Sequence, residues 1–224
     1  MSESCASGCV NPPDRIKIGT VGPPLPGFEV RRADDGELLL RGPGVMAGYR
    51  NEPEQTREVL DDDGWLATGD VGEIDAEGYV RIVDRKKELI INAAGKNMSP
   101  ANIEATLKSA SPLIGQAVAI GDRRPYNVAL VTLDPDAARA FAREQGIGGA
   151  SLGAIASAEA VRRAVAGGVE AANKRLARVE QIKRFKLLPA EWQAGGDELT
   201  PTMKLKRKTI AEKYQGEIDA LYDG

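Results

Sequence analysis

The 224-residue sequence predicts an α+β protein in two parts, a region of β-hairpins followed by a unit of mixed helices and strands. Two hairpin signals lie within the first 86 residues, and helical and strand-like patterns alternate from residue 87 onward. The charge divides at the same place. Residues 1–86 carry 10 Lys and Arg against 17 Asp and Glu, a net of −7, whereas residues 87–224 carry 20 against 16, a net of +4. We therefore expect a domain boundary between residues 86 and 87.

The first part is expected to consist mainly of β-hairpins. Residues 1–26 are rich in Gly, Pro, Ser and Cys and are expected to be irregular. "FEVRRADDGELLLRG" (28–42) has two strand-like runs around Asp35-Gly36, and residues 71–84 repeat the pattern around a turn at 75–78. Residues 51–60 are typical of a short helix with Pro53 in its first turn. Such a region is too small and too open at its sheet edges to form a core alone, so it is expected to end a larger domain.

The second part has the patterns of a unit that can fold alone. Residues 99–110 are expected to form a helix, with Ser99 as its N-cap and Pro100 at its first position. Apolar runs predict strands at 114–122 and 127–134. A further helix is expected at 135–146, closed by Gly146.

The rest of the second part is expected to be a linker, a long helix, a strand and a terminal helix. Residues 147–157 are small and glycine-rich, which favours a loop or linker. Apolar residues recur at helical spacing over 158–180, where Gly167-Gly168 is expected to interrupt or kink the helix. A strand is expected at 181–189 and a terminal helix at 208–222.

The composition excludes several classes of protein. Hydrophobic residues make up 42% and charged residues 28%, an ordinary globular composition, and neither a membrane-spanning run nor a signal pattern is found. A cytoplasmic protein is therefore the default expectation. Two cysteines and no histidine exclude a zinc site of the usual kind and remove the usual general base. If the protein is an enzyme, it is expected to work by binding and electrostatics.

The positive charge of the second part is too weak to predict a partner by itself. A domain with a net charge of +4 could bind phosphate groups, but this charge is far below that of a strongly basic nucleic-acid-binding domain. Two domains that merely differ in surface charge would explain it equally well. We therefore expect no nucleic-acid partner.

Thr68-Gly69-Asp70 is the first motif with a chemical interpretation. An aspartate after a glycine at the end of a strand is most often a turn residue. The alternative is a carboxylate that accepts hydrogen bonds from the two hydroxyls of a nucleotide ribose. The triplet alone does not decide between these interpretations.

The stretch "DRKKELIINAAGKN" (84–97) carries a stronger signal. A run of charges is usually a solvated surface, and Asp84 to Glu88 would fit that interpretation. This run, however, lies at the expected boundary and precedes a loop of small residues, 92–95. Residues at a joint that changes its backbone conformation are loosely packed and polar. The pattern therefore favours a hinge.

Two further segments hold candidate residues. "DELTPTMKLKRK" (197–208) is most simply a basic surface loop before a helix, but Lys204 is expected to lie on an exposed, mobile stretch from which it can reach an anionic oxygen. Met1-Ser2-Glu3 starts the chain with a hydroxyl and a carboxylate. A disordered terminus explains these residues equally well.

Taken together, these stretches resemble the adenylate-forming superfamily of acyl-CoA synthetases, luciferases and nonribosomal adenylation domains. The similarity runs over nearly the whole chain. Its most specific part is "GYRNEPEQTREVLDDDGWLATGDVGEIDAEGYVRIVDRKKELIINAAGKNMSPANIE". With "LTPTMKLKRK" (199–208), this sequence is most similar to the bacterial type of long-chain fatty acid–CoA ligase.

The resemblance implies a role for each candidate residue. Asp70 would bind both ribose hydroxyls of ATP and of acyl-AMP, and Arg85 would also contact the nucleotide. Lys87 would be the hinge about which a C-terminal lid turns. Lys204 would be the catalytic lysine of that lid, bridging the fatty-acid carboxylate and the α-phosphate.

The remaining implied roles concern Ser2, Glu3 and Gly95. Ser2 and Glu3 would end a Tyr-Gly-Met-Ser-Glu motif, with Ser2 near the phosphates and Glu3 helping to hold Mg²⁺. The loop at Gly95 would face coenzyme A after the lid has turned. The implied substrates are a fatty acid, ATP and coenzyme A.

The resemblance also implies that most of an ATP site lies outside this chain. Residues 1–86 would be the C-terminal end of the large AMP-binding domain, and 87–224 the α+β lid. The phosphate loop and the acyl tunnel belong upstream of Met1, so the chain alone is expected to be inactive without an N-terminal large domain. Peripheral membrane contact stays open.

Two alternatives remain. The chain could be the lid of a ligase that passes acyl-AMP to a carrier protein, or a free-standing regulatory lid for a separately encoded large domain.

Overall fold

The computed structural model describes residues 1–223 and divides the chain into two compact units, Met1–Glu88 and Leu89–Gly224. The expected α+β class is confirmed. The division falls two residues after the boundary that the charge pattern suggests. The assignment of these units as the end of a large domain and a lid stays a prediction.

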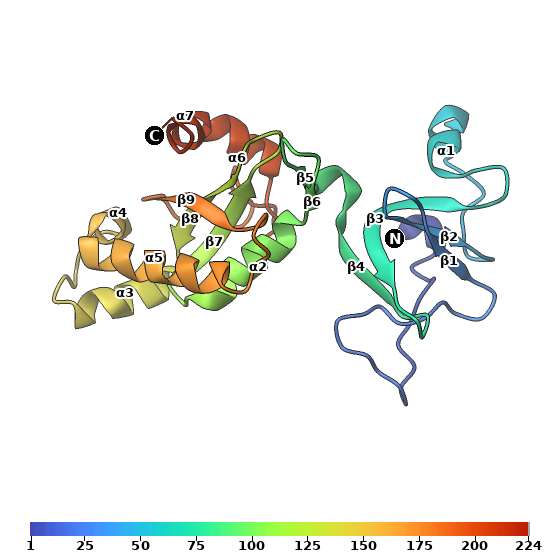
Figure 1. The fold of residues 1–224 in the computed structure, drawn as a ribbon, viewed down its shortest axis with the longest axis horizontal. Coiled ribbons are helices and arrows are strands. Elements are labelled where there is room, and N and C mark those ends of the chain that lie inside the picture. Colours follow the sequence, from blue (N-terminus) through green and yellow to red (C-terminus); the bar gives the residue numbers. More distant parts are fainter. Residues whose placement is uncertain (224) are drawn as a thin grey trace. The chain divides into compact units, whose positions relative to one another are not determined.

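The first unit is built on one antiparallel sheet in the order β1-β2-β3-β4 (Figure 1). Its strands are β1 (Glu29–Arg32), β2 (Glu37–Arg41), β3 (Leu66–Ile74) and β4 (Val80–Arg85). Both expected hairpins are confirmed, and the pairing of β2 with β3 joins them into one sheet. The unit also contains a 3₁₀ turn, η1 (Ser2–Ser4), and the expected short helix α1 (Pro53–Val59), with proline in its first turn.

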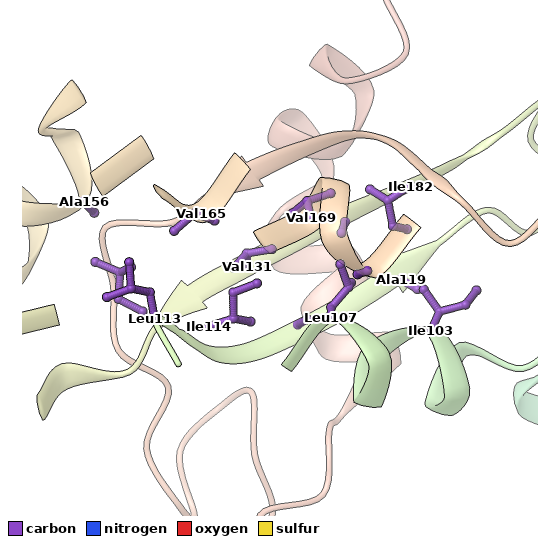
Figure 2. Close-up of a cluster of buried hydrophobic side chains, with 14 of the residues drawn as sticks. Ile103, Leu107, Leu113, Ile114, Ala119, Val131, Ala156, Val165, Val169 and Ile182 are labelled. Carbon is purple, nitrogen blue, oxygen red and sulfur yellow. The ribbon is translucent and has the colours of Figure 1, made fainter. Parts of the chain in front are cut away.

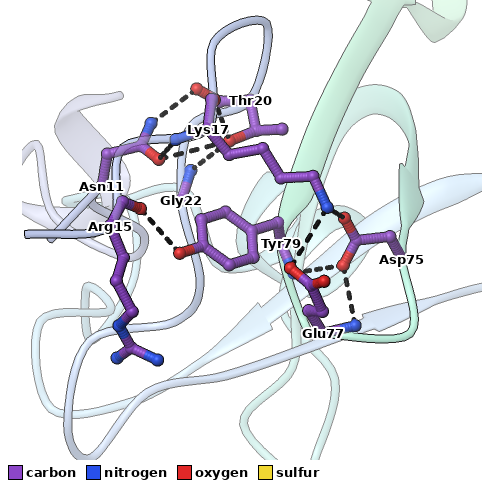
Figure 3. A network of polar contacts seen from close by, with 8 residues as sticks. All are labelled: Asn11, Arg15, Lys17, Thr20, Gly22, Asp75, Glu77 and Tyr79. Atoms are coloured by element: carbon purple, nitrogen blue, oxygen red, sulfur yellow. Dashed lines mark hydrogen bonds and ion pairs between the residues drawn. The ribbon is translucent and has the colours of Figure 1, made fainter.

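Side chains hold the irregular segment 11–22 (Figure 3), together with a backbone bridge between Gly22 and Val80 of β4. The Asn11 amide donates to the Thr20 carbonyl (2.8 Å) and its oxygen accepts the Lys17 N–H (3.0 Å). Lys17 Nζ pairs with the carboxylate of Asp75, and the Tyr79 hydroxyl donates to the Arg15 carbonyl (2.7 Å). These contacts fasten the segment to the β3–β4 hairpin.

The second unit contains a three-stranded sheet in the order β7-β8-β9, with β7 and β8 antiparallel and β8 and β9 parallel. A small hairpin precedes it. The strands are β5 (Ile90–Ile91), β6 (Asn97–Met98), β7 (Ile114–Ile120), β8 (Asn127–Leu133) and β9 (Ile182–Leu187). The helices are α2 (Pro100–Ala110), α3 (Pro135–Glu144), α4 (Leu152–Ser157), α5 (Glu159–Asn173), α6 (Arg207–Lys213) and α7 (Gln215–Ala220).

Two hydrophobic clusters cover the two faces of this sheet. Side chains alternate between faces along a strand, so Ala129 and Val131 of β8 join one cluster while Leu130 joins the other. The larger cluster packs helices α2 to α5 against the sheet through residues such as Leu107 and Val165 (Figure 2). The smaller cluster packs α6 and α7 on the other face. Every residue of β8 is buried, as expected for a strand covered on both faces.

Local signals at the helix ends act as expected. The Ser99 hydroxyl accepts the Asn102 N–H at 3.0 Å and so caps α2. Gly146 has φ 73°, and the Ile147 N–H returns to the Ala142 carbonyl (2.9 Å), so that the expected glycine closure after α3 is confirmed.

Three expectations about helices are wrong. Residues 147–157 are not all loop, because α4 begins after Ser151, whose hydroxyl accepts the Ala154 N–H. The helix expected over 158–180 ends at Asn173 and runs unbroken through Gly167-Gly168. The terminal helix divides at Tyr214, which has φ −109° and whose hydroxyl bonds to Glu198.

Close packing against a neighbouring residue, and not a bend in the helix, requires glycine at position 168. A Cβ at Gly168 would lie 2.6 Å from the Ser111 Cβ, closer than real Cβ contacts allow, whereas a Cβ at Gly167 would meet nothing within 4 Å. The glycine therefore permits a close approach between α5 and the end of α2.

Among residues 1–223, no helix has the length and apolar character needed to cross a membrane.

Candidate functional site

The Thr68-Gly69-Asp70 triplet lies at a bulge inside β3. Leu39 of β2 pairs with Ala67 and Glu37 pairs with Val71, so three residues of β3 lie opposite one residue of β2. Gly69 has φ 71°, a left-handed conformation that glycine adopts at low cost. The interpretation as a turn at the end of a strand is therefore wrong. A bulge of this kind re-aims a side chain, here that of Asp70.

Asp70 and Arg85 form an ion pair across β3 and β4. They are register partners, and Arg85 Nε lies 2.9 Å from the Asp70 carboxylate. Arg85 Nη1 also donates to the Thr68 carbonyl at 3.4 Å. Burial raises the pKa of the Asp70 carboxyl, while the positive charge of Arg85 acts in the opposite direction. Burial outweighs the ion pair because the Asp70 side chain is only 19% exposed, whereas that of Arg85 is 52% exposed.

The Asp70–Arg85 pair lines a cavity of about 230 Å³ in the first unit. Its other walls are mainly apolar and include Leu38, Leu40 and Ile82. Complete small-molecule sites are about 300–1,000 Å³ and combine apolar walls with a few convergent polar groups. The cavity therefore has the composition of a binding site but a smaller volume.

Ser2 and Glu3 lie in η1 beside this cavity but do not line it. Ser2 is exposed, and the Glu3 carboxylate accepts the Tyr49 hydroxyl at 3.1 Å. Hydrogen bonds from its own backbone N–H and then from Tyr49 lower the pKa of Glu3, with a further contribution from the charge of Arg85. The carboxylate is thus a hard, ionised oxygen ligand at neutral pH, the kind that Mg²⁺ accepts. In residues 1–223, no group of three or more Cys, Asp or Glu side chains could hold a metal by itself.

The charged run Asp84 to Glu88, expected to be part of a hinge, begins in β4 and ends in a short 3₁₀ turn, η2 (Lys86–Glu88), at the end of the first unit. Lys86 Nζ lies 2.7 Å from both the Asp35 and the Glu37 carboxylates. Lys87 is exposed. The charged stretch therefore contains one anchored lysine and one exposed lysine in succession.

The Gly95 loop of the second unit is a closed turn between β5 and β6. The Asn92 side-chain oxygen accepts the backbone N–H of Ala94 (3.0 Å) and of Lys96 (2.9 Å). Gly95 has φ 75°, and a Cβ there would meet nothing within 4 Å, so its left-handed backbone is what requires glycine.

Lys204 is exposed, as expected, but its loop is held by hydrogen bonds. Leu199 and Leu205 form a bridge at the base of the loop. The Lys204 carbonyl accepts the Thr200 N–H (2.8 Å), and the Lys204 N–H donates to the Thr200 hydroxyl (3.0 Å). Met203 takes a left-handed conformation with φ 63°. The sequence pattern did not predict this closed turn.

Among the predicted residues, the first unit brings Asp70 and Arg85 into contact and keeps Ser2 and Glu3 nearby. Gly95 and Lys204 belong to the second unit. Sequence reasoning missed Glu37 and Tyr49, which bond to Gly69 and Glu3. The available signal for Glu37 was an acidic residue at the start of the apolar run "ELLLR".

Residues 87–224 match the family model described as the AMP-binding enzyme C-terminal domain. The chain belongs to this family. The matched range includes Lys87, the Gly95 loop and the Lys204 turn. Asp70 and Arg85 precede it.

Relatives of this chain are longer proteins that are named as fatty-acid–CoA ligases. The chain is 55% identical over 223 residues to fatty-acid–CoA ligase fadD11 of Mycobacterium tuberculosis, covering 99% of this chain and 39% of the relative. It is 42% identical to long-chain-fatty-acid–CoA ligase FadD15 of Mycobacterium bovis, covering 100% of this chain and 37% of that protein. The chain therefore corresponds to the C-terminal part of such ligases and spans less than half their length.

A solved structure shares the fold. The A domain of a carboxylic acid reductase from Segniliparus rugosus, in complex with AMP and a co-purified carboxylic acid, matches with a TM-score of 0.70 and 25% identity. The match covers 90% of this chain and 32% of that chain.

Proposed function

We propose that this chain is the C-terminal part of an ATP-dependent ligase that joins long-chain fatty acids to coenzyme A. The observation that carries the proposal is the Asp70–Arg85 pair on a largely apolar cavity, next to the ionised carboxylate of Glu3. The names of the relatives support the substrate class. The AMP bound by the carboxylic acid reductase supports a nucleotide as a ligand of proteins that share this fold.

In this proposal Asp70 and Arg85 hold the nucleotide. A carboxylate has only acceptor sites, so Asp70 can accept hydrogen bonds from both vicinal hydroxyls of a ribose. Arg85 is the neighbouring donor, and its half-exposed guanidinium can contact nucleotide oxygens while it orients Asp70.

The first reaction is the transfer of AMP to the fatty acid. A carboxylate oxygen of the fatty acid attacks the α-phosphorus of ATP, the bond to the bridging oxygen breaks, and pyrophosphate leaves. The fatty-acid carboxylate is already ionised at neutral pH, so a chain without histidine needs no general base for this step. The ammonium group of Lys204 would offset the negative charge that develops at the α-phosphate.

Ser2 and Glu3 fit a magnesium and phosphate role by their chemistry. Mg²⁺ is held in proteins through one or two carboxylates together with substrate phosphates and water, so a single ionised Glu3 is sufficient from the protein side. When bound, the ion would supply charge neutralisation at the phosphates. Ser2 and Ser4 flank Glu3 in the chain, and Ser4 is buried whereas Ser2 is exposed, so Ser2 is the hydroxyl that would donate to a phosphate oxygen.

The second reaction forms the thioester. The thiol sulfur of coenzyme A attacks the acyl carbonyl of acyl-AMP, the thiol proton passes to solvent, and AMP leaves. We assign Lys87 as the hinge that lets the second unit turn between the reactions. The Gly95 loop would then line the path of the thiol.

A lysine variant in a complete ligase that carries this chain tests the proposal. Lys204→Ala is expected to slow acyl-adenylate formation about 10²- to 10³-fold, the usual effect of losing one electrostatic donor at a transition state. Thioester formation from preformed acyl-AMP should be retained. Lys208→Ala is the matched control, because Lys208 is a lysine four positions away with a 91% exposed side chain. Equal loss of both reactions in Lys204→Ala would contradict the assigned role.

The acceptor and the nucleotide site need separate measurements. Asp70→Ala should raise the KM for ATP, and an unchanged KM would show that Asp70 does not bind the nucleotide.

Product analysis with coenzyme A or with a carrier protein distinguishes a CoA ligase from a ligase that loads a carrier. Thioester formed only on the carrier protein would contradict the proposed acceptor.

A further inference from the structure

Glu37 is a buried acidic residue with two specific partners in the first unit. It is 7% exposed and lies at the start of β2. One carboxylate oxygen accepts the Gly69 N–H at 2.8 Å, and the other lies 2.7 Å from Lys86 Nζ. Gly69 immediately precedes Asp70, and Lys86 immediately follows Arg85. Glu37 thus joins the two chain segments that carry the Asp70–Arg85 pair.

The β3 bulge explains why a side chain is needed at this place. Three residues of β3 face only Leu38 of β2, so the bulge removes ordinary ladder partners from the backbone. Side chains replace them. The Thr68 hydroxyl donates to the Leu38 carbonyl (2.7 Å) and accepts the Asp70 N–H (3.1 Å), and Glu37 accepts the Gly69 N–H. The bulge that turns Asp70 toward the cavity wall is therefore held by the side chains of Thr68 and Glu37.

Lys86 makes the buried charge of Glu37 tolerable. A buried carboxylate needs a cation or several donors, and Lys86 supplies the cation. Lys86 also binds Asp35, whose side chain is 53% exposed. Hydrogen bonds that the Lys86 ammonium donates to Asp35 and then to Glu37 raise the pKa of Lys86, so its ammonium stays charged over the pH range of the other groups.

We propose that Glu37 is a positioning residue of the nucleotide site, which fixes the Gly69 N–H and thereby the Asp70 carboxylate, while Lys86 holds Glu37 in place. The inference rests on the proposed role of Asp70 in binding ribose. It adds a residue that touches no substrate and acts through another residue. The competing explanation is that the Glu37–Lys86 pair merely stabilises the sheet.

Amide exchange in the 224-residue chain tests the positioning directly. Hydrogen exchange of the Gly69 amide is measured by NMR in the wild type, Glu37→Gln and Glu37→Leu. Loss of a hydrogen bond to a charged group should speed exchange roughly 10- to 100-fold in Glu37→Leu. Glu37→Gln should fall in between, because its side-chain oxygen can still accept the N–H. Asp35→Asn is the control. Asp35 contacts the same Lys86 ammonium from an exposed position, so this variant should leave the exchange rate of the Gly69 amide unchanged.

A Gly69 amide that exchanges at the wild-type rate in both folded Glu37 variants would overturn the inference. If Glu37→Leu does not fold, Glu37→Gln decides alone, since it keeps the shape of the side chain. Acceleration confined to Gly69 and Asp70 supports positioning. Equal acceleration across every amide of β2 and β3 supports a purely stabilising role and overturns the proposal.

Kinetics in a complete ligase add a second readout. Asp70 is proposed to bind the ribose of both ATP and acyl-AMP, so Glu37→Gln should raise the KM for both by the same factor and leave kcat nearly unchanged. A merely stabilising residue would lower the amount of active enzyme and hence kcat, with KM unchanged. If Asp70→Ala leaves both KM values unaltered while Gly69 exchange still responds to Glu37, the proposed nucleotide role fails but the positioning of Asp70 stands.

Discussion

Arg207 binds Glu104 through both ends of its guanidinium group, and this pair fastens the base of the Lys204 turn. Nη2 lies 2.8 Å from Oε2, and Nη1 donates to Oε1. Glu104 is on α2, its side chain is 7% exposed, and Oε1 also accepts the Ala119 N–H of β7 (2.9 Å). Arg207 is the first residue of α6 and follows Lys204 by three positions. The exposed lysine is thus attached to a buried, well-bonded anchor.

Removing the guanidinium from this pair should strongly destabilise the second unit. Arg207→Ala takes the neutralising cation away from a buried carboxylate, which typically costs about 3–5 kcal/mol. Urea unfolding followed by Trp192 fluorescence, in a background with Trp65→Phe, measures the free energy of unfolding of this unit. Lys208→Ala, on the neighbouring exposed position, should change it by less than about 0.5 kcal/mol. Similar effects from the two variants would contradict the assignment of Arg207 as an anchor.

The adjacent glycines of α5 should respond in opposite directions to the same substitution. Gly168→Ala would place its Cβ 2.6 Å from the Ser111 Cβ and should destabilise the protein by about 1–3 kcal/mol through overpacking. Gly167→Ala meets nothing within 4 Å and should stabilise the helix by roughly 0.5–1 kcal/mol. Thermal unfolding of the two variants measures the difference. A Gly167→Ala variant as unstable as Gly168→Ala would show that the helix needs glycine for its backbone.

The Asp70 carboxyl should titrate above its ordinary pKa, and two neighbours should move that value in opposite directions. Burial raises the pKa, Arg85 lowers it and Glu37 raises it. Arg85→Met should therefore raise the pKa of Asp70 further, and Glu37→Gln should lower it. Carboxyl ¹³C NMR against pH measures each value. A fall in Arg85→Met would contradict the ion pair.

The sign of the effect on stability follows from the same shift. The folded protein keeps the Asp70 proton to a higher pH than the unfolded chain does. The free energy of unfolding contributed by this group is therefore largest below the ordinary pKa of aspartate and decreases as the pH rises toward the raised folded value. Asp70→Asn should remove this decrease, which stability measurements across that acidic range would detect.

The segment 11–22 should become sensitive to trypsin when its side-chain network is broken. Asn11→Ala removes the bonds to the Thr20 carbonyl and the Lys17 N–H, so cleavage after Arg15 and Lys17 should accelerate about tenfold or more through local opening. Mass spectrometry of timed digests identifies the cleaved bonds. Asp14→Ala is the control, because that side chain is 79% exposed and its ion pair is 4.0 Å long. Equal cleavage rates in Asn11→Ala and Asp14→Ala would contradict the role of Asn11 in holding the segment.

Much of the local structure could be predicted because its causes lie within a few residues. The hairpin at Asp35-Gly36, the Ser99 cap and the Gly146 closure each depend on one residue type with a defined backbone or capping preference. Apolar spacing predicts a helix over 158–180, but the backbone does not remain helical past Asn173. In the sequence, the glycine pair of α5 suggests a bend, because the residue that actually requires glycine at position 168, Ser111, lies far away in the chain.

The sequence by itself determined the family, the positions of the candidate residues and most strands and helices, since motifs and periodicity are local properties of the chain. Only the tertiary structure decided how Asp70 is held. Glu37 meets Gly69 across 32 positions and Lys86 across 49, and no local pattern connects them. The physical reason is that a bulge leaves backbone groups without ladder partners, and those groups must bond to whichever buried side chain the folded sheet brings beside them.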